Sequence, residues 1–246
     1  CYNRLSHAVM MASPGALEDF AVGFSLTSGV VTGSDQILDL EVSQREDRVI
    51  LDISLNQRSL SALKASRRTM AGTSSCGLCG IDSLAQALKP IDLPFRSSFG
   101  VLPPLAHFRY LRQRFQAAQE NLRSSGAMHA AIYVDELGET SLCREDIGRH
   151  NALDKLVGAC EREGCDLQKG FVAITSRCSL ELIQKSVRCG VSTLVSLASP
   201  SDMAVSWAHE YHLNLLHQPA RGAARLYAGA DIGGGPDSSL PIGGSL

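Results

Sequence analysis

The sequence predicts an α/β protein in which a domain of alternating strands and helices follows a smaller α+β unit. From residue 129 to residue 228, short apolar runs alternate with helical apolar patterns. This alternation favours a largely parallel sheet covered by helices on both faces. Closer to the start, one helical pattern precedes two segments that alternate apolar and polar residues, as strands do. The 246 residues are 44% hydrophobic and 20% charged, which is ordinary for a globular protein.

The α+β unit is predicted to occupy residues 1–70. It opens with a helix between residues 10 and 33, for which Ser13 is the expected cap and Gly29 the expected stop. Glu18 and Asp19 suit its N-terminal half, and we interpret them as a solvated complement to the helix dipole. Strands are expected at residues 37–42 and 49–55.

Three basic residues, Lys64, Arg67 and Arg68, then lead into a segment with two cysteines. Two interpretations of them are equally open. They form either a solvated turn or a local positive field that lowers a thiol pKa or attracts phosphate. Residues 71–104 are predicted to be this cysteine segment and a proline-containing linker.

Residues 105–228 are predicted to form the α/β domain, and the Gly- and Ser-rich residues 229–246 a disordered tail. A long helix is expected over residues 105–126, and a later one with Ser199 as its cap and Pro200 in its first turn. The other expected elements are strands at 130–134, 140–142, 171–175, 193–197, 213–216 and 225–227, and helices at 153–160 and 180–187.

The chemistry is expected at Cys76-Gly-Leu-Cys79, which follows the hydroxyl residues 73–75. A C-x-x-C pair is half of a zinc site, a redox dithiol, or a nucleophilic thiol with a helper. Zinc needs a second half, and the other six cysteines form no second C-x-x-C. A redox pair is expected after a strand, which is not predicted here. A reactive thiol is therefore favoured, and no metal is expected.

Composition argues against several other classes. The net charge of −2 gives no overall basic field for nucleic acid. No apolar run approaches the roughly 18 residues that predict a membrane span. The eight cysteines are irregularly spaced, which favours reduced thiols and a cytoplasmic location. Because the sequence begins at Cys1, we expect that an N-terminal piece is missing.

Four motifs, in order, resemble those of the FdhD family of formate dehydrogenase accessory sulfurtransferases. They are S-P-G-A-L-E-D-F-A-V-G-F at residues 13–24, T-S-S-C-G-L-C-G at 73–80, R-E-D-I-G-R-H-N-A-L-D-K at 144–155 and S-R-C-S-L-E-L-I-Q-K at 176–185. The resemblance extends over about residues 8–228.

The resemblance implies a cytoplasmic sulfur carrier that matures formate dehydrogenase. It implies that Cys76 takes persulfide sulfur from a cysteine desulfurase, with Cys79 as a supporting thiol. The sulfur would pass to the bis-guanine-dinucleotide molybdenum cofactor, which is bound as a substrate and partly mimicked by GDP; no intrinsic cofactor is implied. Two alternatives stay open, a cofactor-binding chaperone without sulfur transfer and a C-x-x-C thiol redox protein. A homodimer is compatible with all three.

The family's cofactor-binding segment matches a stretch that departs from the family pattern. The aromatic residue is absent, Pro219 intrudes, and Arg221 matches the family arginine. The expected cofactor-binding residues are His217, Gln218, Pro219, Ala220, Arg221 and Gly222.

The order of elements also resembles the cytidine deaminase-like fold, a three-layer α/β/α domain that the FdhD family shares. Deaminases need H-x-E at one helix start and P-C-x-x-C at another. Here Ala152 stands two residues after His150, where the deaminase motif has glutamate. Three residues after Cys178 stands Glu181, where the second motif has cysteine. We therefore predict no deamination. Within the helices we expect the pairs His150–Asp154 and Glu181–Lys185. The two helix starts, near residues 148–151 and 176–179, suit phosphate.

Overall fold

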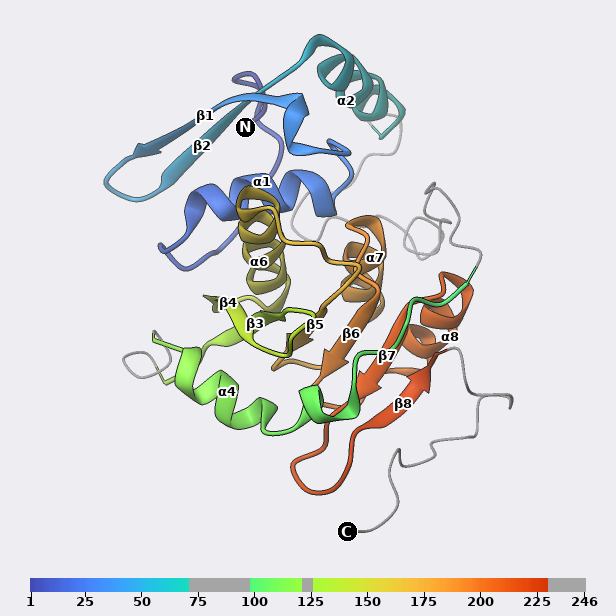
Figure 1. Cartoon of the computed structure of the whole chain (residues 1–246). Coiled ribbons are helices and arrows are strands. Elements are labelled where there is room, and N and C mark those ends of the chain that lie inside the picture. Colours follow the sequence, from blue (N-terminus) through green and yellow to red (C-terminus); the bar gives the residue numbers. More distant parts are fainter. Residues whose placement is uncertain (71–97, 121–125, 230–246) are drawn as a thin grey trace.

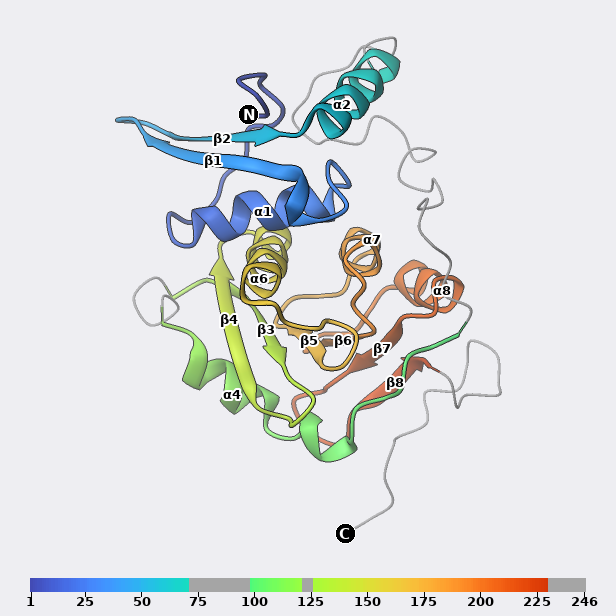
Figure 2. The same ribbon diagram turned by 45° about the horizontal axis from the view of Figure 1, so that its top comes forward.

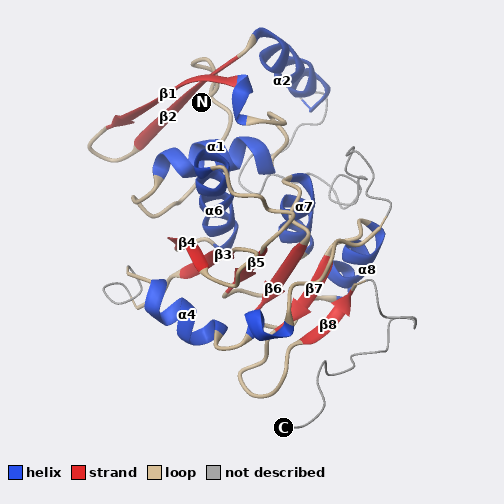
Figure 3. Cartoon of the chain, viewed as in Figure 1, coloured by secondary structure: helices blue, strands red, loops and turns tan. Residues whose placement is uncertain are grey.

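A computed structural model describes residues 1–70, 98–120 and 126–229, with the side chains of residues 67–70 excepted (Figure 1). Its strands form two sheets. A two-stranded sheet belongs to the N-terminal unit, and a six-stranded sheet is the centre of the α/β domain. Figure 3 shows the helices that surround them. The α/β class is confirmed.

The six-stranded sheet has the strand order β4-β3-β5-β6-β7-β8. Only β5, β6 and β7 are parallel neighbours, and the other three pairs are antiparallel. The expectation of a largely parallel sheet is therefore wrong. β3–β4 and β7–β8 are consecutive strands with short connections, which permit only antiparallel pairing. The bounds are β3 (His129–Val134), β4 (Thr140–Asp146), β5 (Phe171–Ile174), β6 (Thr193–Ser196), β7 (Asn214–His217) and β8 (Arg225–Ala228).

Helices cover both faces of this sheet, as predicted (Figure 2). One face carries α6 (Arg149–Glu163), α7 (Leu180–Arg188) and α8 (Asp202–Glu210). The other carries η2 (Leu105–Phe108) and α4 (Leu111–Ala118). Alternate residues of β3 supply the two cores: Ala131 and Tyr133 belong to the first, Ala130, Ile132 and Val134 to the second. This alternation is what a strand buried on both faces requires.

The N-terminal unit lies on the α6 side of the domain (Figure 2). α1 packs on α6, and the β1–β2 hairpin covers α1 from outside. The strands match their predicted positions. The bounds are α1 (Leu17–Thr27), η1 (Ser34–Gln36), β1 (Ile37–Gln44), β2 (Val49–Leu55) and α2 (Gln57–Met70).

The sequence did not predict α2. Lys64, Arg67 and Arg68 belong to this helix and not to a turn. The side-chain oxygen of Asn56 accepts a hydrogen bond from the amide of Ser59 at 2.9 Å, which caps the helix. Leu60 and Leu63 of this helix are buried and form its contact with the core.

Three other helix boundaries differ from the prediction. α1 begins at Leu17, after Ala16 in the left-handed region (φ 54°), and Ser13 is not its cap. The long helix expected over residues 105–126 is interrupted between η2 and α4, where Tyr110 has φ 59°. The cap of α8 is Ser201, whose hydroxyl accepts from the amide of Ala204, and not Ser199.

Gly29 follows the end of α1 as predicted, and Gly190 follows the end of α7. Gly29 and Gly190, one residue past the caps of α1 and α7, both have positive φ, which glycine adopts without strain. The predicted division of the chain at residues 70, 104 and 228 stays a prediction. Most of the cysteine segment and linker, and nearly all of the tail, lie outside the described residues.

Candidate functional site

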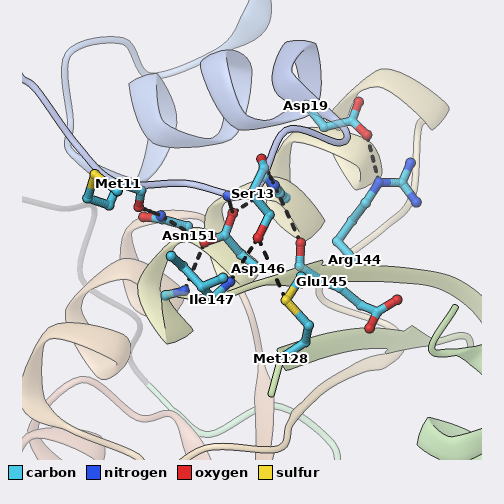
Figure 4. Close-up of polar contacts among 11 residues, drawn as sticks. Met11, Ser13, Asp19, Met128, Arg144, Glu145, Asp146, Ile147 and Asn151 are labelled. Atoms are coloured by element: carbon cyan, nitrogen blue, oxygen red, sulfur yellow. Dashed lines mark hydrogen bonds and ion pairs between the residues drawn. The ribbon is translucent and has the colours of Figure 1, made fainter. Parts of the chain in front are cut away.

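Asp146 ends β4 and is completely buried, although it carries a carboxylate (Figure 4). Four donors surround it. The backbone amides of Ser13 and Gly148 donate at 2.9 and 2.8 Å, and the side chain of Asn151 at 3.0 Å. The ammonium of Lys155 lies 2.7 Å away. A buried carboxylate needs such a complete set of partners.

Lys155 is buried as completely as its partner. Besides Asp146, its ammonium donates to the carbonyl oxygens of Ser13 at 2.9 Å and Glu145 at 3.4 Å. These partners account for the three protons of the ammonium group. Lys155 is therefore held as a structural cation.

The same network fixes the segment before α1 against the start of α6 (Figure 4). Asn151 donates to the carbonyl of Met11 at 2.8 Å, and the amide of Ile147 donates to the hydroxyl of Ser13 at 3.1 Å. Ser13, predicted as a helix cap, thus joins two segments that are 133 residues apart along the chain.

Asp19 forms a second cluster, which corrects the prediction that it is solvated. It is buried and accepts hydrogen bonds from Arg144, at 2.7 Å, and from Arg162. Glu18 is exposed and pairs with Arg162 at 2.8 Å. The Asp19 carboxylate of α1 is thus paired with a guanidinium group from β4 and another from α6, which an argument from the dipole of α1 alone does not predict.

A third cluster joins α6 to α7, and it corrects both predicted pairs within helices. Asp154 pairs with Lys185 at 2.6 Å and accepts from the hydroxyl of Thr27 at 2.7 Å. His150 lies 3.4 Å from Glu181. Each predicted member thus has a partner on the neighbouring helix. Burial lowers the pKa of His150, which favours its neutral form.

The three clusters bring together three of the four motifs that carry the family resemblance, those at residues 13–24, 144–155 and 176–185. Most of their charged side chains pair with one another and hold α1 on α6 and α7, whereas Arg149 and Arg177 are exposed. The paired motif residues therefore position the N-terminal unit, and a substrate site has to be built from other residues.

The predicted cofactor-binding segment leaves the sheet at the carboxyl end of β7. His217 is buried, Gln218 and Pro219 are half-buried, and residues 220–222 are exposed. The side chain of Gln218 donates to the carbonyl oxygen of Gly222 at 3.1 Å and so closes the segment into a loop.

Two arginines that sequence reasoning missed lie beside this loop. Arg225 is the partner of His217 across the β7–β8 ladder, and Arg112 of α4 donates to the carbonyl of Leu197 at 2.9 Å. Burial, and then the charges of Arg225 and Arg112, lower the pKa of His217. Its Nδ1 atom is buried and has no hydrogen-bond partner in the described structure. The strand pairing could have revealed Arg225, but α4 was predicted only as part of a longer helix.

The start of α6 also carries basic groups. Arg149 is exposed there, and burial together with the charge of Arg149 lowers the pKa of the half-buried His129. The N-caps of α6 and α7, Gly148 and Ser179, form no side-chain capping bond. These features suit an anion.

Cys76 and Cys79 lie outside the described residues. Among the described cysteines, burial raises the pKa of Cys143, Cys178 and Cys189 to about 12. Thiols with such pKa values carry almost no thiolate at neutral pH and are poor nucleophiles. In the described ranges, no group of three or more His, Cys, Asp or Glu side chains is arranged to hold a metal ion.

The helices within the described ranges are all too short or too polar to cross a membrane.

Comparison with known proteins gives concordant results. The model of the FdhD/NarQ family matches residues 1–232. A protein named sulfur carrier protein FdhD from Cupriavidus necator is 39% identical over 227 residues, covering 92% of this chain and 78% of the relative. A protein of the same name from Bordetella petrii is 36% identical, with 92% of this chain and 81% of the relative covered.

A solved structure has the same fold. It is a crystal structure from Desulfotalea psychrophila, assigned as a formate dehydrogenase accessory protein. The TM-score is 0.66 at 17% identity, and the match covers 94% of this chain and 84% of the other.

Proposed function

The chain belongs to the FdhD/NarQ family, and on this basis we propose that it is a sulfur carrier required for formate dehydrogenase activity. One observation carries the proposal. Relatives named sulfur carrier protein FdhD match 92% of the chain, and the chain has the pair Cys76–Cys79 in a Gly- and Ser-rich segment.

In the proposed first step, the Cys76 thiolate attacks the outer sulfur of a persulfide on a cysteine desulfurase. A new S–S bond forms on Cys76, the S–S bond of the donor breaks, and the donor cysteine leaves as a thiolate. The step is an exchange that needs no external oxidant or reductant, and it is fastest for a thiol whose pKa is near ambient pH.

The raised pKa values of Cys143, Cys178 and Cys189 support this assignment. Buried thiols of high pKa compete poorly for a persulfide. These three thiols are therefore disfavoured as carriers, and we assign the sulfur to the 76–79 pair, with Cys79 as a supporting thiol in the same segment.

The carrier then delivers sulfur to the bis-guanine-dinucleotide molybdenum cofactor, its substrate, in the cytoplasm. The loop His217, Gln218, Pro219, Ala220, Arg221 and Gly222 holds this cofactor, with Arg112 and Arg225 beside it. Guanidinium groups bind phosphate oxygens through charged hydrogen bonds, which is what a dinucleotide requires. GDP is a partial mimic.

Replacing each cysteine by alanine tests the carrier assignment. After incubation with a cysteine desulfurase and cysteine, Cys76→Ala should carry no persulfide at the pair and should not restore formate dehydrogenase activity. Cys79→Ala should retain measurable loading. The measurement is persulfide-selective mass spectrometry together with the enzyme assay.

Two outcomes would contradict the proposal. Maturation by a Cys76→Ala variant that still binds GDP would indicate a cofactor-binding chaperone without sulfur transfer. A reversible Cys76–Cys79 disulfide with dithiol reductase activity would indicate a redox protein.

A further inference from the structure

α2 is the most one-sidedly charged element of the described structure. Its 14 residues include Arg58, Lys64, Arg67 and Arg68 and no acidic residue, although the chain as a whole has a net charge of −2. Arg58 and Lys64 are exposed. Neither forms an ion pair with a carboxylate anywhere in the described ranges. At the α1–α6–α7 interface, in contrast, Arg144 and Arg162 pair with Asp19, and Lys185 pairs with Asp154.

The stability of α2 does not account for these charges. Arg58 occupies the first turn, where a cation opposes the helix dipole. Lys64 has no acidic residue three or four positions away along α2, so no ion pair within the helix offsets its charge. Burial does not account for them either, since Leu60 and Leu63 make the contacts with the core.

The position of α2 suggests what the charges do. The helix lies at the outer end of the N-terminal unit (Figures 1 and 2) and ends at Met70. Cys76 follows Met70 by six residues in the sequence. Six residues of polypeptide span at most about 20 Å. A protein that exchanges sulfur with Cys76 must therefore place its reacting sulfur within about 20 Å of the end of α2.

We propose that the exposed face of α2 is the docking surface for the protein sulfur donor, and that this donor presents an acidic surface beside its persulfide. The inference rests on the proposed function as a sulfur carrier. Unpaired cations on the partner-facing side steer an acidic protein and raise its association rate, an effect that salt weakens.

The test compares two double variants of equal charge change. Arg58→Glu/Lys64→Glu alters α2, and Arg109→Glu/Lys169→Glu alters two exposed residues of the α/β domain. We expect the α2 variant to raise the KM for the cysteine desulfurase by about tenfold with an unchanged kcat. The control should load as wild type does. Raising NaCl from about 50 to about 500 mM should slow loading of the wild type much more than loading of the α2 variant.

Two features keep the test decisive. A glutamate at position 58, in the first turn of α2, interacts favourably with the helix dipole. The α2 variant should therefore remain folded, which circular dichroism can check. Inorganic polysulfide, a donor without a protein surface, should load all three proteins equally. Equal loading of wild type and α2 variant by the desulfurase would overturn the docking surface. Failure of every protein to load from either donor would instead overturn the carrier function.

Discussion

Asp146 and Lys155 illustrate how this chain handles buried charge at the level of single residues. Both are buried, and each has hydrogen-bond partners from two segments in addition to its ionic partner. Such a pair is weak evidence for net stabilisation, because desolvation offsets the attraction. Replacing only one of the two residues, however, leaves the charge of the other unpaired in the core.

Lys155→Met should therefore destabilise the protein by about 3–5 kcal/mol, since the Asp146 carboxylate loses its cation while keeping its burial. Lys169→Met is the matched control, because Lys169 is 63% exposed and lies 3.9 Å from Asp166. The control should change stability by less than about 0.5 kcal/mol. Urea unfolding measures both. A Lys155→Met variant as stable as the control would show that the pair is not needed to hold residues 11–13.

Three buried or half-buried histidines should make the stability of the protein depend on pH. Burial lowers the pKa of His129, His150 and His217 in the folded protein. Below the ordinary histidine pKa of about 6.5, the unfolded chain then binds protons that the folded chain does not. The contribution of these histidines to the free energy of unfolding should be constant above this pH and should be lost as the pH is lowered through it.

The measurement is urea unfolding at about pH 7.5 and about pH 5.5, and the loss between them should shrink in His150→Gln. An unchanged difference in this variant, and also in His217→Gln and His129→Gln, would assign the pH dependence to other groups.

At the level of elements, α1 and α6 cross with their backbones in contact. A Cβ atom built on Gly23 would lie 1.7 Å from the carbonyl oxygen of Asp154. A Cβ atom on Gly158 would lie 1.9 Å from that of Asp19. Real Cβ atoms do not approach backbone so closely, and backbone cannot turn aside as a side chain does. Glycine at both positions allows the two helix backbones to approach closely enough for Asp19 and Asp154 to form their ion pairs with neighbouring elements.

Gly158→Ala should force the two helices apart and destabilise the protein by about 3 kcal/mol. The sign is informative, because helix propensity alone would make the alanine variant more stable by about 1 kcal/mol. Gly15→Ala is the control, since a Cβ atom there meets nothing within 4 Å. Thermal unfolding of both variants provides the comparison. A stabilised Gly158→Ala would mean that the crossing is looser than described.

At the level of the whole molecule, sequence periodicity predicted the elements better than their relations. Both faces of the sheet, the β1–β2 hairpin and the strand positions followed from local pattern. The pairing of Asp154 with Lys185 and of His150 with Glu181 did not, because spacing within one helix cannot reveal which helix is its neighbour. The expectation of a largely parallel sheet failed at β3–β4 and β7–β8, whose short connections permit only antiparallel pairing, and at β3–β5.

The candidate site shows the same limit. Family resemblance predicts the loop after β7 as a binding site, but only the structure shows that Arg112 of α4 and Arg225 of β8 lie near His217. Local pattern predicts a solvated Asp19, because its partners Arg144 and Arg162 lie 125 and 143 residues away in sequence. No local pattern carries information over such distances.

These long separations also set an order in time. Asp19 is synthesised 125 residues before Arg144, and Ser13 precedes Asp146 by 133 residues. At about 5–20 residues per second, the ribosome needs roughly 6–27 seconds to supply those partners. During this interval the buried face of α1 has no α6 to pack against. The N-terminal unit is thus made first and completed late, when the chain has been synthesised past Arg162.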